Sequence, residues 1–278
     1  MTQRQRHTGT TLVTAGLMVW ACVTTAGCSG SGAAAEDARS ADPVGTLRRV
    51  ADTLVDAGSS KARTSMEMAT GGTRVTIRGE GVYHFGRRSG RLKVLLPQDP
   101  AGARARRPIT ELLAPGALFM KNRGAGVPAD KWVRVDTATL SDGNLVTGGA
   151  TDPLAAAEVL RGTRTATYVG ETQVAGTPVR HYRGVADLRA AARAASAANR
   201  GPLASAAKGF ASAEVPFDVY LDEQGRVRKV RHRFSFVGGR SGGTVAVAST
   251  TLLYAFGTPA DVRLPAAADI YAGRIAEE

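Results

Sequence analysis

The chain has 278 residues, 43% of them hydrophobic, which is enough to bury a substantial core in one large domain or two small ones. The formal net charge is +12, but the basic residues are scattered and form no single run, so we do not expect a nucleic-acid partner. A basic surface equally favours anionic lipid headgroups or envelope polymers. The two cysteines, Cys22 and Cys28, lie near the N-terminus and cannot crosslink the rest of the chain.

Residues 1–27 have the pattern of a lipoprotein signal peptide. A basic start precedes a short apolar stretch over residues 11–23, which is too short for a comfortable transmembrane helix. The stretch ends in Thr25-Ala26-Gly27-Cys28, which resembles a bacterial lipobox, although the usual pattern has Leu at the position of Thr25. We predict cleavage between Gly27 and Cys28 and lipidation of the Cys28 thiol. The alternative is an ordinary secretory signal followed by a chance cysteine.

Lipidation would attach the protein to the extracytoplasmic face of the cell membrane, because acyl chains stably anchor a protein when two or more are present. Residues 28–42 are small and polar, without apolar periodicity, and we predict a flexible tether there. Residues 43–278 are then expected to form a single domain.

The first half of this domain opens with a helix and continues in strands. Helical spacing of apolar residues over 43–57, with Asp42 as cap, predicts one helix ended by Gly58. Alternating apolar residues over 64–96 predict successive strands separated by glycines at 71–72, 79–81 and 86–90. Two further extended segments follow, at 109–121, interrupted at Pro115-Gly116, and at 132–135.

The second half also begins with a helix. Asp152-Pro153 predicts the start of a helix that runs to Arg161. Strands are expected at 163–174 and 177–186, and an Ala-rich helical segment at 188–210 is expected to break at Gly201-Pro202. The remaining strands are predicted at 215–221, 226–236 and 244–256, the first two joined by a turn that needs Gly225 at positive φ.

Strands dominate this pattern, which favours one α+β domain built on a large antiparallel sheet. The stretches LDEQGRVRKVR (221–231) and YAFGTPADVRLP (254–265) resemble the C-terminal half of the LppX/LprG-like lipoproteins of actinobacteria, which share the fold of the LolA/LolB lipoprotein carriers. The resemblance implies a strongly curved antiparallel half-barrel wrapped over a few helices, with an apolar cavity between sheet and helices. It also implies an envelope lipoprotein that carries a lipid.

Motifs for catalysis are isolated. Gly239 to Gly243 match G-x-S-x-G, but a strand follows the serine and every histidine precedes it, which excludes the hydrolase arrangement. Ser205 to Lys208 match S-x-x-K without the accompanying motifs. The four histidines are dispersed, and we predict neither a metal site nor another cofactor, and no enzyme. His232 is interpreted as a core or cavity-rim residue.

The leading hypothesis is a membrane-anchored lipoprotein that binds or carries a lipid, glycolipid or other hydrophobic molecule, with an envelope exporter or partner protein as a possible second partner. The alternative is a structural or sensory envelope module that uses the curved sheet as a docking surface. If one face of the sheet lines a cavity, the alternation of apolar and polar residues selects these candidates: Met66, Met68, Val75, Ile77, Leu92, Val94, Phe217, Val219, Val230, Phe234 and Phe236.

Overall fold

The computed structural model describes residues 42–70, 73–97, 107–124, 126–147, 150–237 and 244–273. The chain divides into two units, Met1–Ala38 and Arg39–Glu278, and every described residue belongs to the second unit. This unit contains all the described helices and strands and a hydrophobic core of its own, so it has the contacts that an independently folding domain needs. The predicted signal peptide, lipidated Cys28 and most of the tether lie outside the described residues.

One antiparallel sheet of 11 strands organises the described part of the chain, in the order β6-β5-β4-β3-β2-β1-β11-β10-β9-β8-β7. The strands are β1 (Ser59–Thr70), β2 (Thr73–His84), β3 (Ser89–Leu95), β4 (Ile109–Ala114), β5 (Ala117–Lys121), β6 (Trp132–Asp136), β7 (Thr163–Val174), β8 (Thr177–Asp187), β9 (Glu214–Leu221), β10 (Val227–Val237) and β11 (Thr244–Tyr254). Each strand pairs with its neighbour in sequence, except that β1 also pairs with β11 and β6 does not pair with β7. The predicted α+β class is confirmed.

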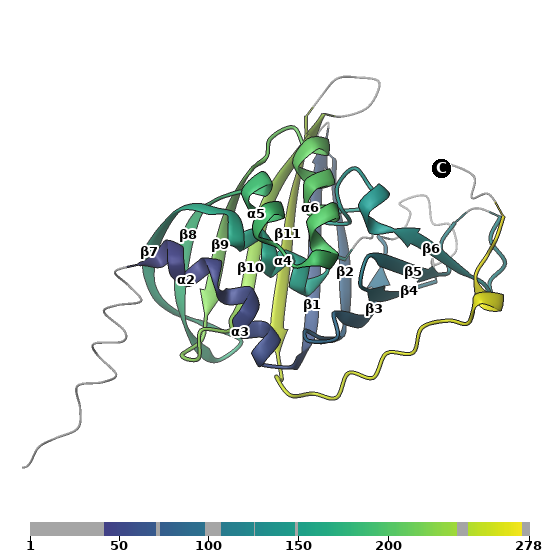
Figure 1. The fold of residues 1–278 in the computed structure, drawn as a ribbon, viewed down its shortest axis with the longest axis horizontal. Helices are drawn as coiled ribbons and strands as arrows, with labels where there is room; N and C mark the ends of the chain where they lie inside the picture. Colours follow the sequence, from purple (N-terminus) through teal and green to yellow (C-terminus); the bar gives the residue numbers. More distant parts are fainter. Residues whose placement is uncertain are drawn as a thin grey trace, which may run out of the picture. The chain divides into compact units, whose positions relative to one another are not determined.

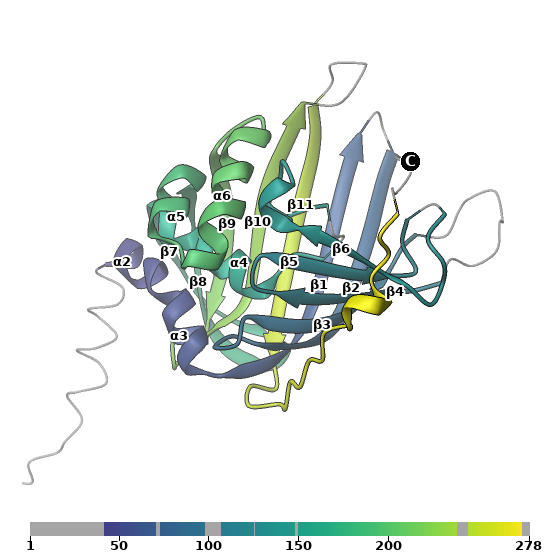
Figure 2. The same cartoon turned by 45° about the vertical axis from the view of Figure 1, so that its right-hand side comes forward.

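The helices lie on one side of the sheet, which curves around them (Figure 1). Figure 2 shows β3 to β6 running across the direction of β10 and β11, which makes the curvature plain. The α-helices are α2 (Pro43–Arg48), α3 (Val50–Asp56), α4 (Pro153–Val159), α5 (Leu188–Ala194) and α6 (Ala197–Gly209). Short 3₁₀ turns occupy Thr137–Thr139, Leu160–Gly162 and Ala267–Asp269. The side of the sheet that faces α4 to α6 is called the inner face, and the opposite side the outer face.

Aspartates cap the helices at the predicted positions. The carboxylate of Asp42 accepts a hydrogen bond from the Gly45 amide at 2.8 Å, and that of Asp152 accepts from the amides of Leu154 and Ala155 at 2.8 and 2.9 Å. Such caps satisfy amides that have no partner within the first helical turn. The first helix is interrupted at Arg49, so the predicted single helix is two short ones, α2 and α3.

Two breaks that the sequence predicted, one between strands and one between helices, differ from the structure. Gly79 to Gly81 do not separate strands but lie inside β2. The neighbouring strand β1 comes so close to Gly79 that a Cβ there would lie 2.6 Å from the Thr64 hydroxyl oxygen, which explains a glycine inside the strand. The Ala-rich helical segment breaks at Ser196 and not at Gly201-Pro202, which lie inside α6. Ser196 leaves the helix because its amide and hydroxyl both donate to the Glu158 carboxylate, at 3.2 and 3.0 Å.

The hairpin between β9 and β10 has the predicted geometry. Gly225 has a φ of 76°, and the amide of Asp222 donates to the carbonyl of Arg226 at 3.0 Å. The Asp222 carboxylate also accepts a hydrogen bond from the Arg226 amide at 2.9 Å, which stabilises the loop. This turn fixes the register of β9 against β10 and decides which side chains of the two strands face the helices.

Candidate functional site

The inner face of the sheet carries all the side chains that the sequence selected as cavity candidates. Fully or nearly fully buried are Met66, Ile77, Leu92, Val94, Phe217, Val219, Val230 and Phe234. Met68, Val75 and Phe236 are partly buried and pack against the same hydrophobic cluster. The structure therefore brings these side chains into one core, and their role in lining a ligand cavity stays a prediction.

Aromatic rings join the sheet to the helices at one end of this core. Phe210, which follows α6, stacks on Phe234 with ring centroids 4.7 Å apart and contacts Phe236 at the same distance. Tyr83 and Tyr182 are also fully buried on the inner face. The sequence reasoning missed Phe210 and Tyr83, because it ranked strand residues by alternation and gave no weight to a ring just beyond a helix end or beside a turn. It also missed Tyr182, which lies within β8.

Helix α4 occupies the centre of the concave side. All of its residues are buried, which is unusual for a helix and means that it is covered by the sheet on one side and by other helices on the other. Polar contacts fix its start: the Tyr83 hydroxyl donates to Asp152 at 3.0 Å, and Thr151 shares a hydrogen bond with Ser249 of β11. Burial raises the pKa of Asp152 to about 6, although hydrogen bonds from the Ala155 amide and Tyr83 oppose this shift.

Glu111 of β4 is the one acidic side chain in the inner-face row that crosses β2 to β6. Its strand neighbours are Leu92 on β3 and Met120 on β5, and Met120 pairs in turn with Val133 on β6. The residue is fully buried, and neither carboxylate oxygen has a hydrogen-bond partner among the described residues. Burial therefore raises the pKa of Glu111 to about 8, so the side chain is mainly protonated at neutral pH.

A second buried polar group lies on β10. His232 is almost fully buried, and its ring Nε2 has no hydrogen-bond partner in the described ranges. Burial lowers its pKa to about 3. Its cross-strand neighbour is Ser249, and Thr251 and Thr64 face each other on the adjacent row with unpartnered hydroxyls. The sequence interpretation placed His232 in the core or at a cavity rim, and the structure places it in the core.

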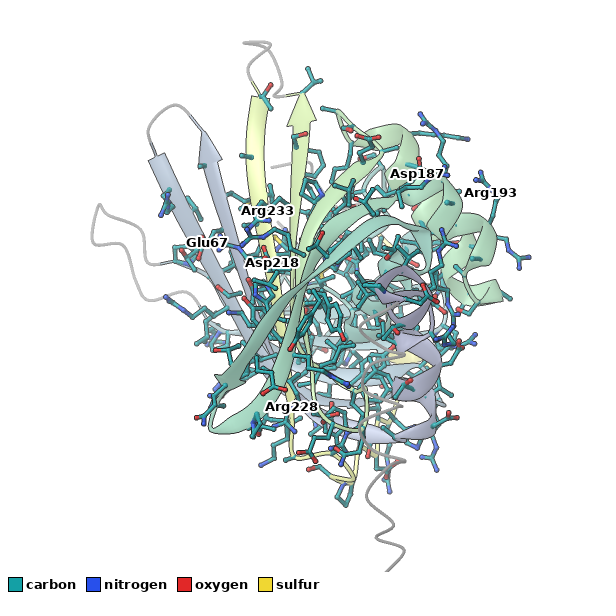
Figure 3. All side chains as sticks on the ribbon, turned by 90° about the vertical axis from the view of Figure 1, so that its left-hand side faces the viewer. Glu67, Asp187, Arg193, Asp218, Arg228 and Arg233 are labelled. Atoms are coloured by element: carbon teal, nitrogen blue, oxygen red, sulfur yellow. The ribbon has the colours of Figure 1, made fainter. Side chains whose placement is uncertain are left out.

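The outer face of the same strands carries an ion cluster around Asp218. Its carboxylate accepts from Arg183 Nε at 2.9 Å and from Arg233 Nη2 at 2.7 Å, and lies 2.9 Å from His181 Nε2. Burial alone would raise the pKa of Asp218, but these hydrogen bonds outweigh it and lower the pKa to about 2. Figure 3 shows Glu67, Asp218 and Arg233 on one side of the sheet and Arg193 on the helices at the other side.

Farther along the outer face, a hollow of about 290 Å³ lies over β1, β2, β3 and β11. Cationic, small and apolar residues line it together. Its lining comprises Arg63, Thr64, Ser65, Arg78, Gly79, Glu80, Lys93, Leu95 and Leu252. Cations outnumber acids across the outer face, where the side chains that point away from the helices include Lys61, Arg63, Arg74, Arg78, Arg91, Lys93, Arg183, Lys229, Arg231 and Arg233.

The described residues contain no group of three or more His, Cys, Asp or Glu side chains that could hold a metal ion. No helix within the described ranges is long and apolar enough to cross a membrane. Ser205 of the S-x-x-K motif donates its hydroxyl to the Ala138 carbonyl at 2.8 Å, which ties α6 to the turn at 137–139. The G-x-S-x-G motif, residues 239–243, falls outside the described residues.

No family model and no curated protein matches the chain. Among solved structures, it is similar to the lipoprotein LppX of Mycobacterium tuberculosis, with 9% identity, a TM-score of 0.42, and coverage of 80% of this chain and 100% of that one. LprF of Mycobacterium bovis is 11% identical, with a TM-score of 0.41 and coverage of 82% and 98%. A putative outer membrane lipoprotein-sorting protein domain of Vibrio parahaemolyticus is 9% identical, with a TM-score of 0.31 and coverage of 78% and 93%.

Proposed function

We propose that the protein is a lipid-anchored lipoprotein on the extracytoplasmic face of the cell membrane, which binds a lipid or other hydrophobic molecule against the inner face of its sheet. The carrying observation is Glu111. A fully buried carboxyl group without a hydrogen-bond partner, set in a row of apolar side chains, is the composition of a ligand site: mostly apolar wall with a few polar groups that orient the ligand.

The free-energy cost of burying the Glu111 carboxyl group supports a role in function. A polar group buried without a hydrogen bond costs roughly 1–3 kcal/mol on the scale of protein mutational data. An apolar residue at position 111 would avoid that cost and would match its neighbours Leu92 and Met120. In its protonated form Glu111 can donate one hydrogen bond and accept another, which suits the hydroxyl and ester groups of a lipid.

Replacement of Glu111 by Leu separates a binding role from a structural one. We expect Glu111→Leu to raise the melting temperature, because it removes the unpartnered carboxyl, and to lower the amount of lipid that co-purifies with the protein. Untargeted lipid mass spectrometry measures the second effect, and Glu171→Leu, at an exposed position on β7, is the matched control. Wild-type protein free of extractable lipid, or an unchanged lipid yield from Glu111→Leu, would contradict the proposal.

The anchor is tested separately. Cys28→Ala should release the protein from the membrane or leave its signal peptide uncleaved, and metabolic labelling with an alkyne fatty acid should mark the wild type alone. Equal membrane retention of both proteins, with no label on the wild type, would refute lipidation at Cys28.

One observation favours a different function, a docking module with a filled interior. Helix α4 is buried along its whole length and covers the inner face near β10 and β11, so this half of the concave side is occupied by the protein itself. A ligand would therefore have to bind toward β2 to β6, where Glu111 lies. The lipid measurement on Glu111→Leu discriminates the two functions, because a docking module would lose no lipid.

A further inference from the structure

We propose that the outer face of β1, β2, β3 and β11 docks on the surface of an anionic phospholipid bilayer, with lipid phosphates received at the hollow between Arg63, Arg78 and Lys93. The proposal concerns the face opposite to the lipid-binding side and does not depend on what the inner face binds.

The register of the sheet places the cations around the hollow. Arg63 of β1 lies between Leu252 of β11 and Glu80 of β2, and Glu80 pairs with Lys93 of β3. On the adjacent row, Arg78 pairs with Leu95. Cross-strand neighbours on one face are about 5 Å apart, so Arg63 and Lys93 flank Glu80, and Arg78 lies on the next row of the same hollow.

The acidic side chain that lines the hollow does not neutralise its positive charge. Glu80 is the single acid in the lining, and its carboxylate oxygen is 3.9 Å from Arg63 Nε, with both side chains more than half exposed. Such a surface pair is weak and screened by water. Among the described residues, neither Arg78 nor Lys93 forms an ion pair with Glu80, and the surrounding outer face carries the same positive sign. The area is therefore complementary to phosphate headgroups.

Apolar side chains distinguish a bilayer from other polyanions. Leu95 is 48% exposed, which is high for a leucine on a strand, and it lines the hollow together with Leu252. A leucine flanked by cations suits the boundary between lipid headgroups and acyl chains, where apolar groups enter the bilayer while charges stay at the phosphates. A soluble polyanion offers no such apolar layer.

The test uses the compact unit, residues 39–278, which lacks Cys28, so lipid attachment cannot hold it on a membrane. Vesicles of phosphatidylcholine with 30% phosphatidylglycerol, and vesicles of phosphatidylcholine alone, are compared by flotation. We expect binding to the anionic vesicles alone, with a loss of about 100-fold on Arg63→Gln, Arg78→Gln and Lys93→Gln together, since each cation near a membrane surface contributes roughly a factor of five.

A second triple variant has the same net charge as the first but loses its cations from another surface. Arg189→Gln, Arg193→Gln and Arg200→Gln remove the same charge from exposed positions on α5 and α6, and we expect them to keep most of the binding. A similar loss in both triple variants would show that net charge alone acts, and would overturn the proposed surface. Absence of binding by the wild type would overturn it as well.

Leu95→Ser tests the apolar part of the site. We expect it to weaken binding to anionic vesicles several-fold, without changing the charge and with little effect on the melting temperature, because Leu95 is half exposed. Unchanged vesicle binding of Leu95→Ser, together with full competition by soluble heparin, would assign the face to a soluble polyanion and overturn the bilayer proposal.

Discussion

The two faces of the sheet treat the same chemical group in opposite ways. Glu111 on the inner face and Asp218 on the outer face are both buried carboxyl groups, yet the pKa of Glu111 is raised to about 8 and that of Asp218 lowered to about 2. Glu111 has no hydrogen-bond partner within the part of the chain that the structure describes, whereas Asp218 accepts hydrogen bonds from Arg183 and Arg233. Burial by itself therefore does not decide the charge of a group; the partners on its face of the sheet decide it.

The contrast extends to the neutral residues of single strands. On β3, Leu92 and Val94 are fully buried on the inner face, and Leu95 is half exposed on the outer face. On β10, Val230 and Phe234 are buried among apolar side chains, while Arg233 beside Phe234 belongs to the ion cluster. The inner face supplies the packing that holds the domain together, and the outer face supplies charge.

The largest effect is expected from truncation on the inner face. Leu92→Ala should lower the free energy of unfolding by about 3 kcal/mol, because it removes buried methyl groups and leaves a cavity. Leu95→Ala, on the same strand but on the outer face, should change it by less than about 0.5 kcal/mol. Urea denaturation of both variants measures the difference, and equal losses would contradict the assignment of the two faces.

The next effect concerns the titration of Glu111. The unfolded chain loses this proton near pH 4.3 and the folded chain near pH 8, so the free energy of unfolding falls as the pH rises between these values. Glu111→Gln removes the titration, and we expect the wild type to lose about 2 kcal/mol more than the variant between pH 6 and pH 8. Parallel stability curves for the two proteins would show that Glu111 is ionised in the fold.

Much of this fold was predictable from local signals. Alternation of apolar and polar residues predicted the extents of β7 to β11 to within a few residues, and Asp152-Pro153 predicted the start of α4. These signals work because each depends on residues adjacent in the chain: a cap needs its own first turn, and a half-buried strand needs its own period of two.

Glu111 could not be found in this way. Along β4, Leu112 is buried on the outer face as firmly as Leu113 on the inner face, because residues of the C-terminal segment, Val262 and Ile270, cover the outer side. The alternation that marks an inward side chain is therefore hidden, and a glutamate in an apolar run reads as a surface residue. The Asp218 cluster was missed for a related reason, since its partners come from β8 and β10 and meet only through the register of the sheet.

A smaller effect is expected from breaking the outer ion cluster. Asp218→Asn should lower the free energy of unfolding by about 1.5 kcal/mol at pH 7, because it removes charged hydrogen bonds to partly exposed arginines. The folded-state pKa lies below the unfolded value of about 3.9, so this contribution is present above pH 4 and disappears as the pH falls toward 2. Denaturation curves at pH 7 and pH 2.5 should therefore differ for the wild type and converge with the variant at the lower pH.

The smallest effect concerns His232 and shows whether the inner face behaves alike for bases and acids. Burial lowers the pKa of His232 to about 3, whereas the unfolded chain binds this proton near pH 6.5. Below pH 6.5 the unfolded state thus holds one more proton than the folded state, and the free energy of unfolding falls as the pH falls. Between pH 7 and pH 5.5 we expect the wild type to lose about 1 kcal/mol more than His232→Gln, measured by urea denaturation at both pH values. Glu111 then destabilises the fold as the pH rises, and His232 destabilises it as the pH falls, because a water-free inner face disfavours the charged form of both the acid and the base. Identical pH profiles of wild type and variant would mean that His232 accepts a proton in the folded state, and that water or a partner reaches the centre of the inner face.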